Sequence, residues 1–122
     1  MPKKILVVDD EPDVLKVTGY RLKKAGYEVI TASDGQMALE VARENKPDLI
    51  LLDIRMPILD GPEVCLRIKD DESLKDIPVI FITASSGNIM NKEKVGELKA
   101  QGFLTKPFEI QELLEIVRSF IG

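Results

Sequence analysis

Four short apolar runs in the sequence each end in polar side chains. KILVVDD reaches Asp9 and Asp10, DLILLD reaches Asp53, PVIFIT reaches Thr83, and GFLTK reaches Lys106. Runs of this length, rich in Ile, Val and Leu, are typical of parallel strands buried on both faces. Ligands of open α/β sheets bind outside the carboxyl ends of such strands. We therefore expect three carboxylates, a hydroxyl and an ammonium group to meet at one edge of a sheet.

Strand patterns alternate with helical patterns along the chain. Strands are predicted at residues 4–9, 27–31, 48–53, 77–83 and 102–105. Helices are predicted at residues 12–25 and 36–45, around Val64 to Ile68, in the poorly patterned stretch before residue 102, and over 110–121. Five strands that alternate with five helices imply right-handed crossovers and a parallel sheet covered by helices on both faces.

The strand order decides which polar groups meet. A doubly wound α/β sheet with the flavodoxin-like order 2-1-3-4-5 places the first and third strands together at its switch point. The third, fourth and fifth strands then follow on one side, so the polar groups that end four strands share a crevice. The second strand ends in Thr31 and Ala32, which carry no charge, and it lies outside that crevice.

Length, cysteine content and charge limit the class of protein. A chain of 122 residues fits one domain, here 1–122. Cys65 is the only cysteine, so a reducing compartment is expected. No apolar run approaches the roughly 20 residues that span a bilayer, and residues 1–8 are too few for a signal peptide. We therefore expect a cytoplasmic protein with no membrane contact. The net charge of −4 argues against direct nucleic-acid binding.

The adjacent acids at the end of the first strand predict a metal site. Asp9, Asp10 and Glu11 repel one another, so a folded surface that keeps them needs a cation or exposure to water. Mg²⁺ prefers oxygen ligands and is commonly held by one or two carboxylates together with phosphate oxygens. We expect Asp10 to bind it directly and Asp9 directly or through water. The alternative, that one of the two aspartates caps the first helix, is equally consistent with the sequence.

Asp53 is the candidate nucleophile. Apolar neighbours raise the pKa of a carboxyl group unless a nearby cation offsets its burial, and a metal ion and Lys106 supply that cation here. An ionised carboxylate can attack phosphorus and form an aspartyl phosphate. The Thr83 hydroxyl and the Lys106 ammonium can then stabilise the phosphoryl oxygens. Taken singly, these residues are more often a strand-terminal acid or helix cap, a β-branched strand residue and a surface lysine, and it is their combined position that favours the phosphoryl site.

Two features flank Lys106. Phe103 lies three residues earlier on the same short strand, and strand alternation places it on the opposite face, where it can respond to movement of Thr83. Pro107 follows directly, so the bond between Lys106 and Pro107 is a candidate cis peptide.

The chain resembles bacterial response-regulator receiver domains over essentially its whole length. The motifs that carry the resemblance are VVDDEP at 7–12, LILLDIRMPILDG at 49–61, VIFITA at 79–84 and FLTKPF at 103–108. The resemblance implies that Asp53 accepts the phosphoryl group, that Lys106 contacts it, and that Thr83 and Phe103 act as switch residues. It also implies a cis peptide before Pro107. The implied ligands of Mg²⁺ or Mn²⁺ are Asp9, Asp10, Asp53 and the backbone carbonyl of Arg55.

The resemblance also implies partners. The chain has no histidine, so a histidine kinase or histidine phosphotransfer protein must donate the phosphoryl group in trans, while the receiver assists its own phosphorylation and dephosphorylation. The readout is expected on the face built from the fourth helix, the fifth strand and the fifth helix, towards a downstream protein or output domain. The sequence leaves open whether the domain forms a dimer on phosphorylation. The chain departs from the family where Lys99 and Gln101 replace the usual Gly-Ala-Asp turn.

Three other functions share features with this sequence. A haloacid-dehalogenase-like phosphatase also uses an aspartyl nucleophile, but such enzymes resemble Asp-x-Asp at that position and this chain has Arg55 as the third residue. Flavin or dinucleotide binding suits the fold, yet the first loop holds acids rather than a Gly-rich phosphate cradle. An interaction module that is never phosphorylated is disfavoured by the complete set of site residues.

Overall fold

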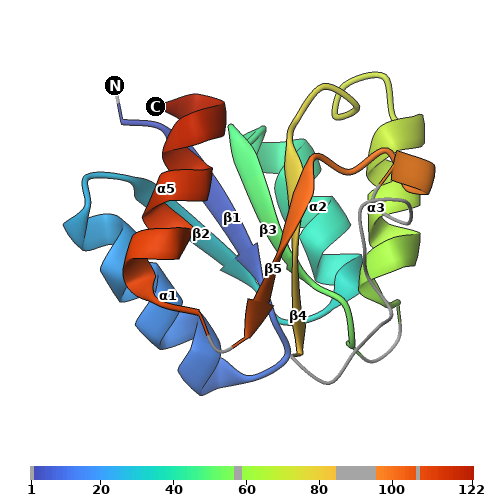
Figure 1. The fold of residues 1–122 in the computed structure, drawn as a ribbon. Coiled ribbons are helices and arrows are strands. Elements are labelled where there is room, and N and C mark those ends of the chain that lie inside the picture. The colour runs from blue at the N-terminus through green and yellow to red at the C-terminus, as the bar shows by residue number, and fades with distance from the viewer. Residues whose placement is uncertain (1, 57–58, 85–95, 107) are drawn as a thin grey trace.

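Five strands form one parallel sheet in a computed structural model that describes residues 2–56, 59–84, 96–106 and 108–122. Along the chain the strands are β1 (Lys4–Val8), β2 (Glu28–Ala32), β3 (Leu49–Asp53), β4 (Val79–Ala84) and β5 (Gly102–Lys106). Their spatial order is β2-β1-β3-β4-β5, and every neighbouring pair is parallel (Figure 1). The predicted α/β fold and strand order are therefore confirmed.

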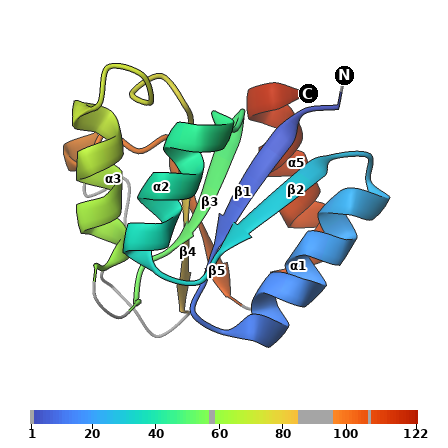
Figure 2. The same ribbon diagram turned by 180° about the vertical axis from the view of Figure 1, so that it is seen from behind.

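Helices cover both faces of the sheet (Figures 1 and 2). The helices α1 (Pro12–Lys24) and α5 (Ile110–Ile121) lie on one face, and α2 (Gly35–Asn45) and α3 (Gly61–Asp70) lie on the other. The predicted fourth helix falls largely on residues 85–95, outside the described residues. In the described part of that stretch, Gly96 and Glu97 are helical and a turn follows them.

The helix starts follow local sequence signals. Pro12 occupies the first position of α1, where its missing N–H costs nothing. Asp34 caps α2 by accepting a hydrogen bond from the Met37 N–H at 2.8 Å. The residue at the N-cap of α1 is Glu11, whose side chain makes no capping bond. The alternative that Asp9 or Asp10 occupies this cap position is therefore wrong, and both aspartates precede the helix.

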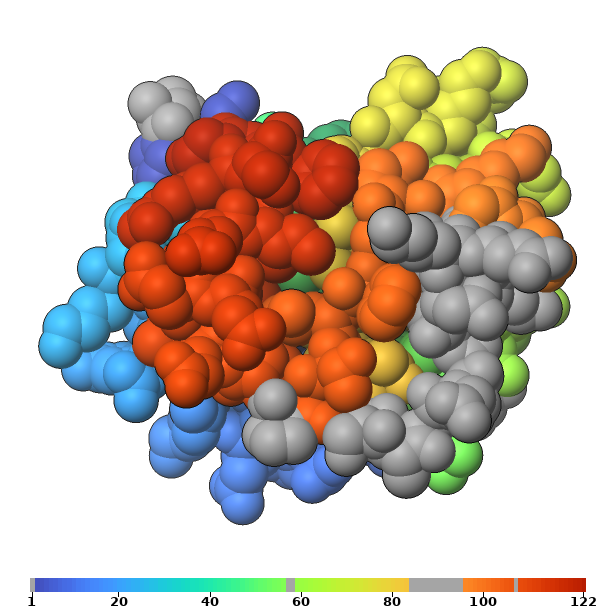
Figure 3. Space-filling view, in the orientation of Figure 1, coloured from blue at the N-terminus to red at the C-terminus, as the bar shows by residue number. Residues whose placement is uncertain are grey.

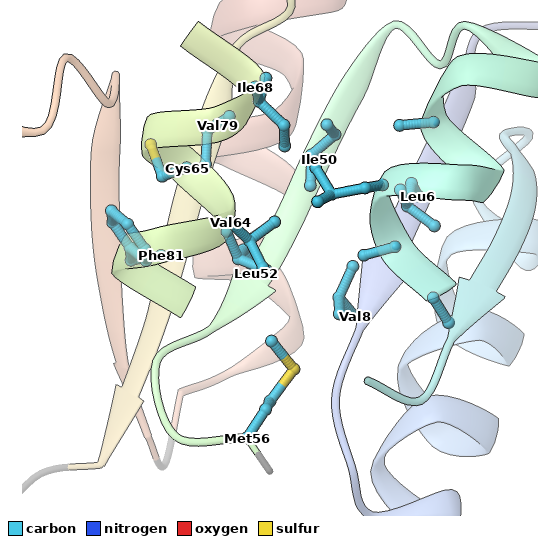
Figure 4. Packing of buried hydrophobic residues seen from close by; sticks show 14 of the residues in the cluster. Leu6, Val8, Ile50, Leu52, Met56, Val64, Cys65, Ile68, Val79 and Phe81 are labelled. Carbon is cyan, nitrogen blue, oxygen red and sulfur yellow. The ribbon is translucent and has the colours of Figure 1, made fainter. Parts of the chain in front are cut away.

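The core consists of two apolar layers separated by the sheet. All five residues of β3 are buried, and full burial of one such aliphatic side chain contributes about 1.5–3 kcal/mol. The layer under α2 and α3, which we call the first core layer, is shown in Figure 4 and includes Leu6, Val8, Ile50, Leu52, Val64, Cys65, Ile68, Val79 and Phe81. The continuous apolar runs are thus explained by burial on both faces.

The second core layer lies between the sheet and the pair of helices α1 and α5. Its buried members include Ile5, Leu22, Leu51, Leu113 and Val117. In the space-filling view, α5 covers the front of the molecule beside β5 (Figure 3). Within the described part of the chain, no helix is both long and apolar enough to cross a bilayer.

Cys65 is expected to resist alkylation in the folded protein. Its side chain is fully buried, its Sγ–H donates to the Leu98 carbonyl at 3.4 Å, and burial raises the pKa of its thiol to about 11. At pH 8 the thiolate is therefore both scarce and inaccessible. We expect iodoacetamide to add no mass to the native protein and one carboxamidomethyl group after denaturation. Equal rates of modification in the two states would contradict this burial.

Candidate active site at the carboxyl ends of the strands

The sheet register brings the ends of four strands to one edge. Val8 pairs with Leu52, so Asp9, which follows the last residue of β1, and Asp53, the last residue of β3, lie at the same end of two adjacent strands. Asp53 pairs with Ile82 of β4, and Lys106 ends β5 opposite Ala84. In Figure 1 these strand ends lie along the lower edge of the sheet. The outer strand β2 ends in Ala32 and adds no charged group to this edge.

Three carboxylates form a cluster at this edge. Asp9, Asp10 and Asp53 each offer one oxygen, and these oxygens all lie within 4.8 Å of one another. Asp9 and Asp53 are 2% and 9% exposed, whereas Asp10 is exposed. Repulsion between partly desolvated carboxylates favours a bound cation, and an all-oxygen donor set suits a hard divalent ion. The donor chemistry therefore fits Mg²⁺ or Mn²⁺.

Lys106 is the cation that the structure places against this cluster. Its Nζ donates to Asp9 Oδ2 at 3.0 Å and lies 4.0 Å from Asp53 Oδ1. The other oxygen of Asp9 accepts from the Glu11 N–H at 2.9 Å. Burial lowers the pKa of Lys106, but the hydrogen bond to Asp9 and the surrounding carboxylates outweigh burial, and the pKa is raised overall. Lys106 is therefore charged at neutral pH and bridges β5 to the acidic loop after β1.

The electrostatic balance at Asp53 differs from that at Lys106. Burial is the largest influence and, with the charges of Asp9 and Asp10, raises the pKa of Asp53 to about 6. Lys106 and a backbone hydrogen bond from Arg55 act in the opposite direction. The protein alone thus only partly compensates this carboxylate. A bound divalent cation would favour the ionised, nucleophilic form further.

The remaining candidates lie within or just after β3, β4 and β5. Thr83 is 5% exposed and pairs in register with Thr105, one residue beyond the partner of Asp53. Phe103 packs against the first core layer, whereas its neighbour Leu104 packs against the second, so the two side chains lie on opposite faces. Arg55 lies in the exposed turn after β3. The predicted cis peptide involves residue 107, which lies outside the described residues.

Sequence reasoning missed the residue that supports the turn after Asp53. Gly61, the first residue of α3, donates its N–H to the Ile54 carbonyl at 2.9 Å. A Cβ atom there would overlap the Asp53 carbonyl oxygen and lie 2.8 Å from Ile54 Cα. Asp60 caps the same helix by accepting from the Glu63 N–H at 3.0 Å. The sequence signal was Asp-Gly-Pro before an apolar helical pattern, which marks a helix start.

Gln101 is one of the two residues that replace the usual Gly-Ala-Asp turn of the family. Its side-chain oxygen accepts from the Val79 N–H at 2.7 Å and from Lys69 Nζ at 3.2 Å. Lys69 also donates to the Ile77 carbonyl at 2.7 Å. These contacts join α3 to the starts of β4 and β5. The glutamine therefore holds this turn through its side chain.

The family model for the response regulator receiver domain matches residues 5–118. The chain belongs to this family. The match spans the acidic loop after β1, the end of β3, the end of β4 and the Lys106 strand, and it confirms both the predicted family and the predicted receiver function. No finding supports the phosphatase alternative.

Known relatives place the domain in signalling proteins. The chain is 42% identical over 121 residues to the alkaline phosphatase synthesis transcriptional regulatory protein PhoP of Bacillus subtilis, covering 99% of the chain and 49% of PhoP. It thus spans about half the length of that relative. It is 35% identical over 122 residues to the polar-differentiation response regulator DivK of Brucella anthropi, covering 100% of the chain and 98% of DivK.

A solved structure provides the comparison for the metal. The receiver domain of the sensor histidine kinase PA1611 from Pseudomonas aeruginosa, determined with a magnesium ion coordinated in the active site cleft, is 32% identical. The two folds superpose with a TM-score of 0.89 over 100% of this chain and 99% of that one. The ion was observed in that protein. In the present chain, the corresponding observation is the cluster of three carboxylates.

Proposed function

We propose that Asp53 accepts a phosphoryl group from the phosphohistidine of a histidine kinase or phosphotransfer protein acting in trans. The observation that carries the proposal is the placement of Asp53 among two other carboxylates within 4.8 Å and a lysine at 4.0 Å. In the reaction, an Asp53 oxygen forms a bond to phosphorus as the bond to the histidine nitrogen breaks. The geometry supplies a nucleophile, negative ligands for a cation and a positive group for the phosphoryl oxygens.

The metal would be held by Asp9, Asp10, Asp53 and the backbone carbonyl of Arg55. When bound, Mg²⁺ or Mn²⁺ neutralises charge on the phosphoryl oxygens and brings them close to the Asp53 carboxylate. A phosphoryl group on Asp53 would give Lys106, whose Nζ lies 4.0 Å from Asp53 Oδ1, a further anionic partner. The Thr83 hydroxyl donates a hydrogen bond to the same group. The receiver in this way assists its own phosphorylation and later hydrolysis.

The conformational output would follow from these contacts. A phosphoryl group adds about −1.5 to −2 charges, which draws Thr83 and Lys106 towards Asp53. Phe103 lies on the face of the sheet that Thr83 shares, and it turns inward when Thr83 moves. Residues 1–122 act as one domain in the cytoplasm, and the altered face comprises the segment between β4 and β5, β5 itself and α5. A downstream protein or output domain reads that face, with dimer formation as one form of readout.

The direct test is the intact mass of the protein after incubation with acetyl phosphate and MgCl₂. We expect the wild type to gain one phosphoryl group and Asp53→Asn to gain none, because the acyl phosphate forms only on that carboxylate. Asp70→Asn, a substitution at an exposed aspartate on α3, serves as the matched control and should be phosphorylated normally. Phosphorylation of Asp53→Asn, or none in the wild type with Mg²⁺ or a cognate kinase, would refute the proposal.

A further inference from the structure

A groove of about 730 Å³ runs along the free edge of the sheet at β2, and none of the residues assigned to phosphoryl transfer line it. Apolar side chains form much of its wall: Leu15 and Tyr20 come from α1, Val29 from β2 and Val41 from α2. Figure 2 shows β2 as the outermost strand, with α1 beside it. Tyr20 remains 61% exposed. The groove therefore wraps around a sheet edge that two helices flank but do not cover.

The backbone of β2 has hydrogen-bonding capacity on this free side. The Glu28 N–H donates to Lys3 O at 2.9 Å, and Ala32 O accepts from the Asp9 N–H at 3.2 Å, so both groups face β1. Peptide groups of a parallel strand alternate in direction with a period of two residues. Val29 and Thr31 consequently direct their N–H and C=O groups towards the groove. Such an edge is a template for one more strand.

The charged side chains that line the groove are positive. Among the described residues that line it, Lys16 and Lys23 are the charged ones, and no carboxylate lines it. The lysines are seven residues apart on α1, about 10.5 Å along the helix axis. This positive strip belongs to a chain whose net charge is −4. A second copy paired symmetrically along the same edge would bring equivalent lysines together, so the charge pattern disfavours self-pairing.

We propose that the β2 edge is a docking site for an extended acidic segment of a partner protein, which adds to the sheet as a sixth strand. Its main chain pairs with the outward groups of Val29 and Thr31, as in other cases of strand addition. Its carboxylates contact Lys16 and Lys23. Apolar side chains on its other face pack against Val41. This surface is distinct from the residues assigned to phosphoryl transfer.

The geometry sets the pattern of the segment. A strand rises about 3.3 Å per residue, so acidic residues four positions apart are separated by about 13 Å. That spacing matches the separation of the two lysines once the flexible lysine stems are included. Side chains two positions apart share one face of the strand. The peptide acetyl-Glu-Val-Thr-Val-Glu-amide therefore presents both carboxylates to α1 and both valines to α2.

The test uses this peptide, fluorescently labelled, with the full chain. We expect saturable binding, slowed hydrogen exchange at the Val29 and Thr31 amides, and a loss of about tenfold in affinity in the double variant Lys16→Glu, Lys23→Glu. The double variant Arg67→Glu, Lys75→Glu on the α3 side carries the same charge change and should bind as the wild type does. A peptide methylated on the three amide nitrogens of its Val-Thr-Val core keeps the charges but loses pairing in either strand direction, and should bind more weakly.

Several results would overturn the proposal. One is the absence of binding at millimolar peptide, and another is binding that leaves exchange at Val29 and Thr31 unchanged. Equal binding of a Lys-Val-Thr-Val-Lys peptide would remove the charge argument. A dimer of the protein alone that the Lys16→Glu, Lys23→Glu variant dissociates would assign the edge to a second copy instead. Both lysines project from the outer part of α1, so their substitution leaves the folded core intact.

Discussion

Asp53→Asn is expected to stabilise the metal-free protein by about 2–3 kcal/mol at pH 8. Burial and the charges of Asp9 and Asp10 raise the pKa of Asp53 to about 6 from its usual 3.8. Each unit of such a shift corresponds to about 1.36 kcal/mol. The amide has the shape of the carboxylate without its charge, so it removes the repulsion within the acidic cluster. The residue that suits phosphoryl transfer thus lowers the stability of the fold.

Because the pKa of Asp53 is raised in the folded protein, the stabilisation by Asp53→Asn depends on pH in a defined direction. The folded-state pKa of Asp53 is higher than the unfolded one, so its favourable contribution is complete below about pH 4. That contribution is lost as the pH rises through about 6 and stays lost above it. The difference in unfolding free energy between Asp53→Asn and the wild type should therefore be small at pH 4, grow between pH 4 and 6, and level off. Urea denaturation at a series of pH values measures it.

A control and a metal titration complete this experiment. Asp70→Asn removes one exposed carboxylate and should change stability by less than about 0.5 kcal/mol at every pH. Added Mg²⁺ should stabilise the wild type, because a ligand of the folded state shifts the unfolding equilibrium. It should stabilise Asp53→Asn less, because one ligand charge is gone. If Asp53→Asn were no more stable than the wild type at pH 8, favourable interactions of the Asp53 carboxylate would have to offset its burial and its repulsion by Asp9 and Asp10.

The strand order and the clustering of charged groups could be predicted from the sequence because both follow from one-dimensional patterns. Apolar runs marked the buried strands, and the polar residue after each run marked the carboxyl end. With parallel strands, this is enough to bring Asp9, Asp53 and Lys106 to one edge. The prediction needed no side-chain geometry. It depended only on right-handed crossovers and on the strand that ends without a charge lying outermost.

The pairing within the cluster could not be predicted in the same way. Lys106 lies 3.0 Å from Asp9 and 4.0 Å from Asp53, a difference set by side-chain rotamers and by the path of the loop after β1. The contact of Lys69 with Gln101 is likewise invisible in the sequence, because the two residues belong to different elements and neither follows a periodic pattern. Distances of this size depend on packing of the whole domain.

Gly61→Ala is expected to destabilise the fold by about 3 kcal/mol, the upper end of the usual cost of overpacking. The new methyl group would overlap the Asp53 carbonyl oxygen and lie 2.8 Å from Ile54 Cα. These are backbone atoms, which cannot rotate away as a flexible side chain can. Relief requires moving α3 from the end of β3, which also lengthens the bond from the Gly61 N–H to the Ile54 carbonyl, 2.9 Å in the native fold.

The same substitution should reduce the rate of phosphorylation, since the displaced peptide carries Asp53 itself. Gly96→Ala is the matched control, because nothing lies within 4 Å of a Cβ atom at that position, and it should leave both stability and phosphorylation nearly unchanged. Thermal denaturation and the time course of mass gain with acetyl phosphate measure the two effects at a temperature where both variants are folded. If Gly61→Ala were as stable as Gly96→Ala, the close approach of α3 to the Asp53 backbone would be incorrect. If it were destabilised yet phosphorylated at the wild-type rate, the turn would tolerate a shift of α3 without moving the Asp53 carboxylate.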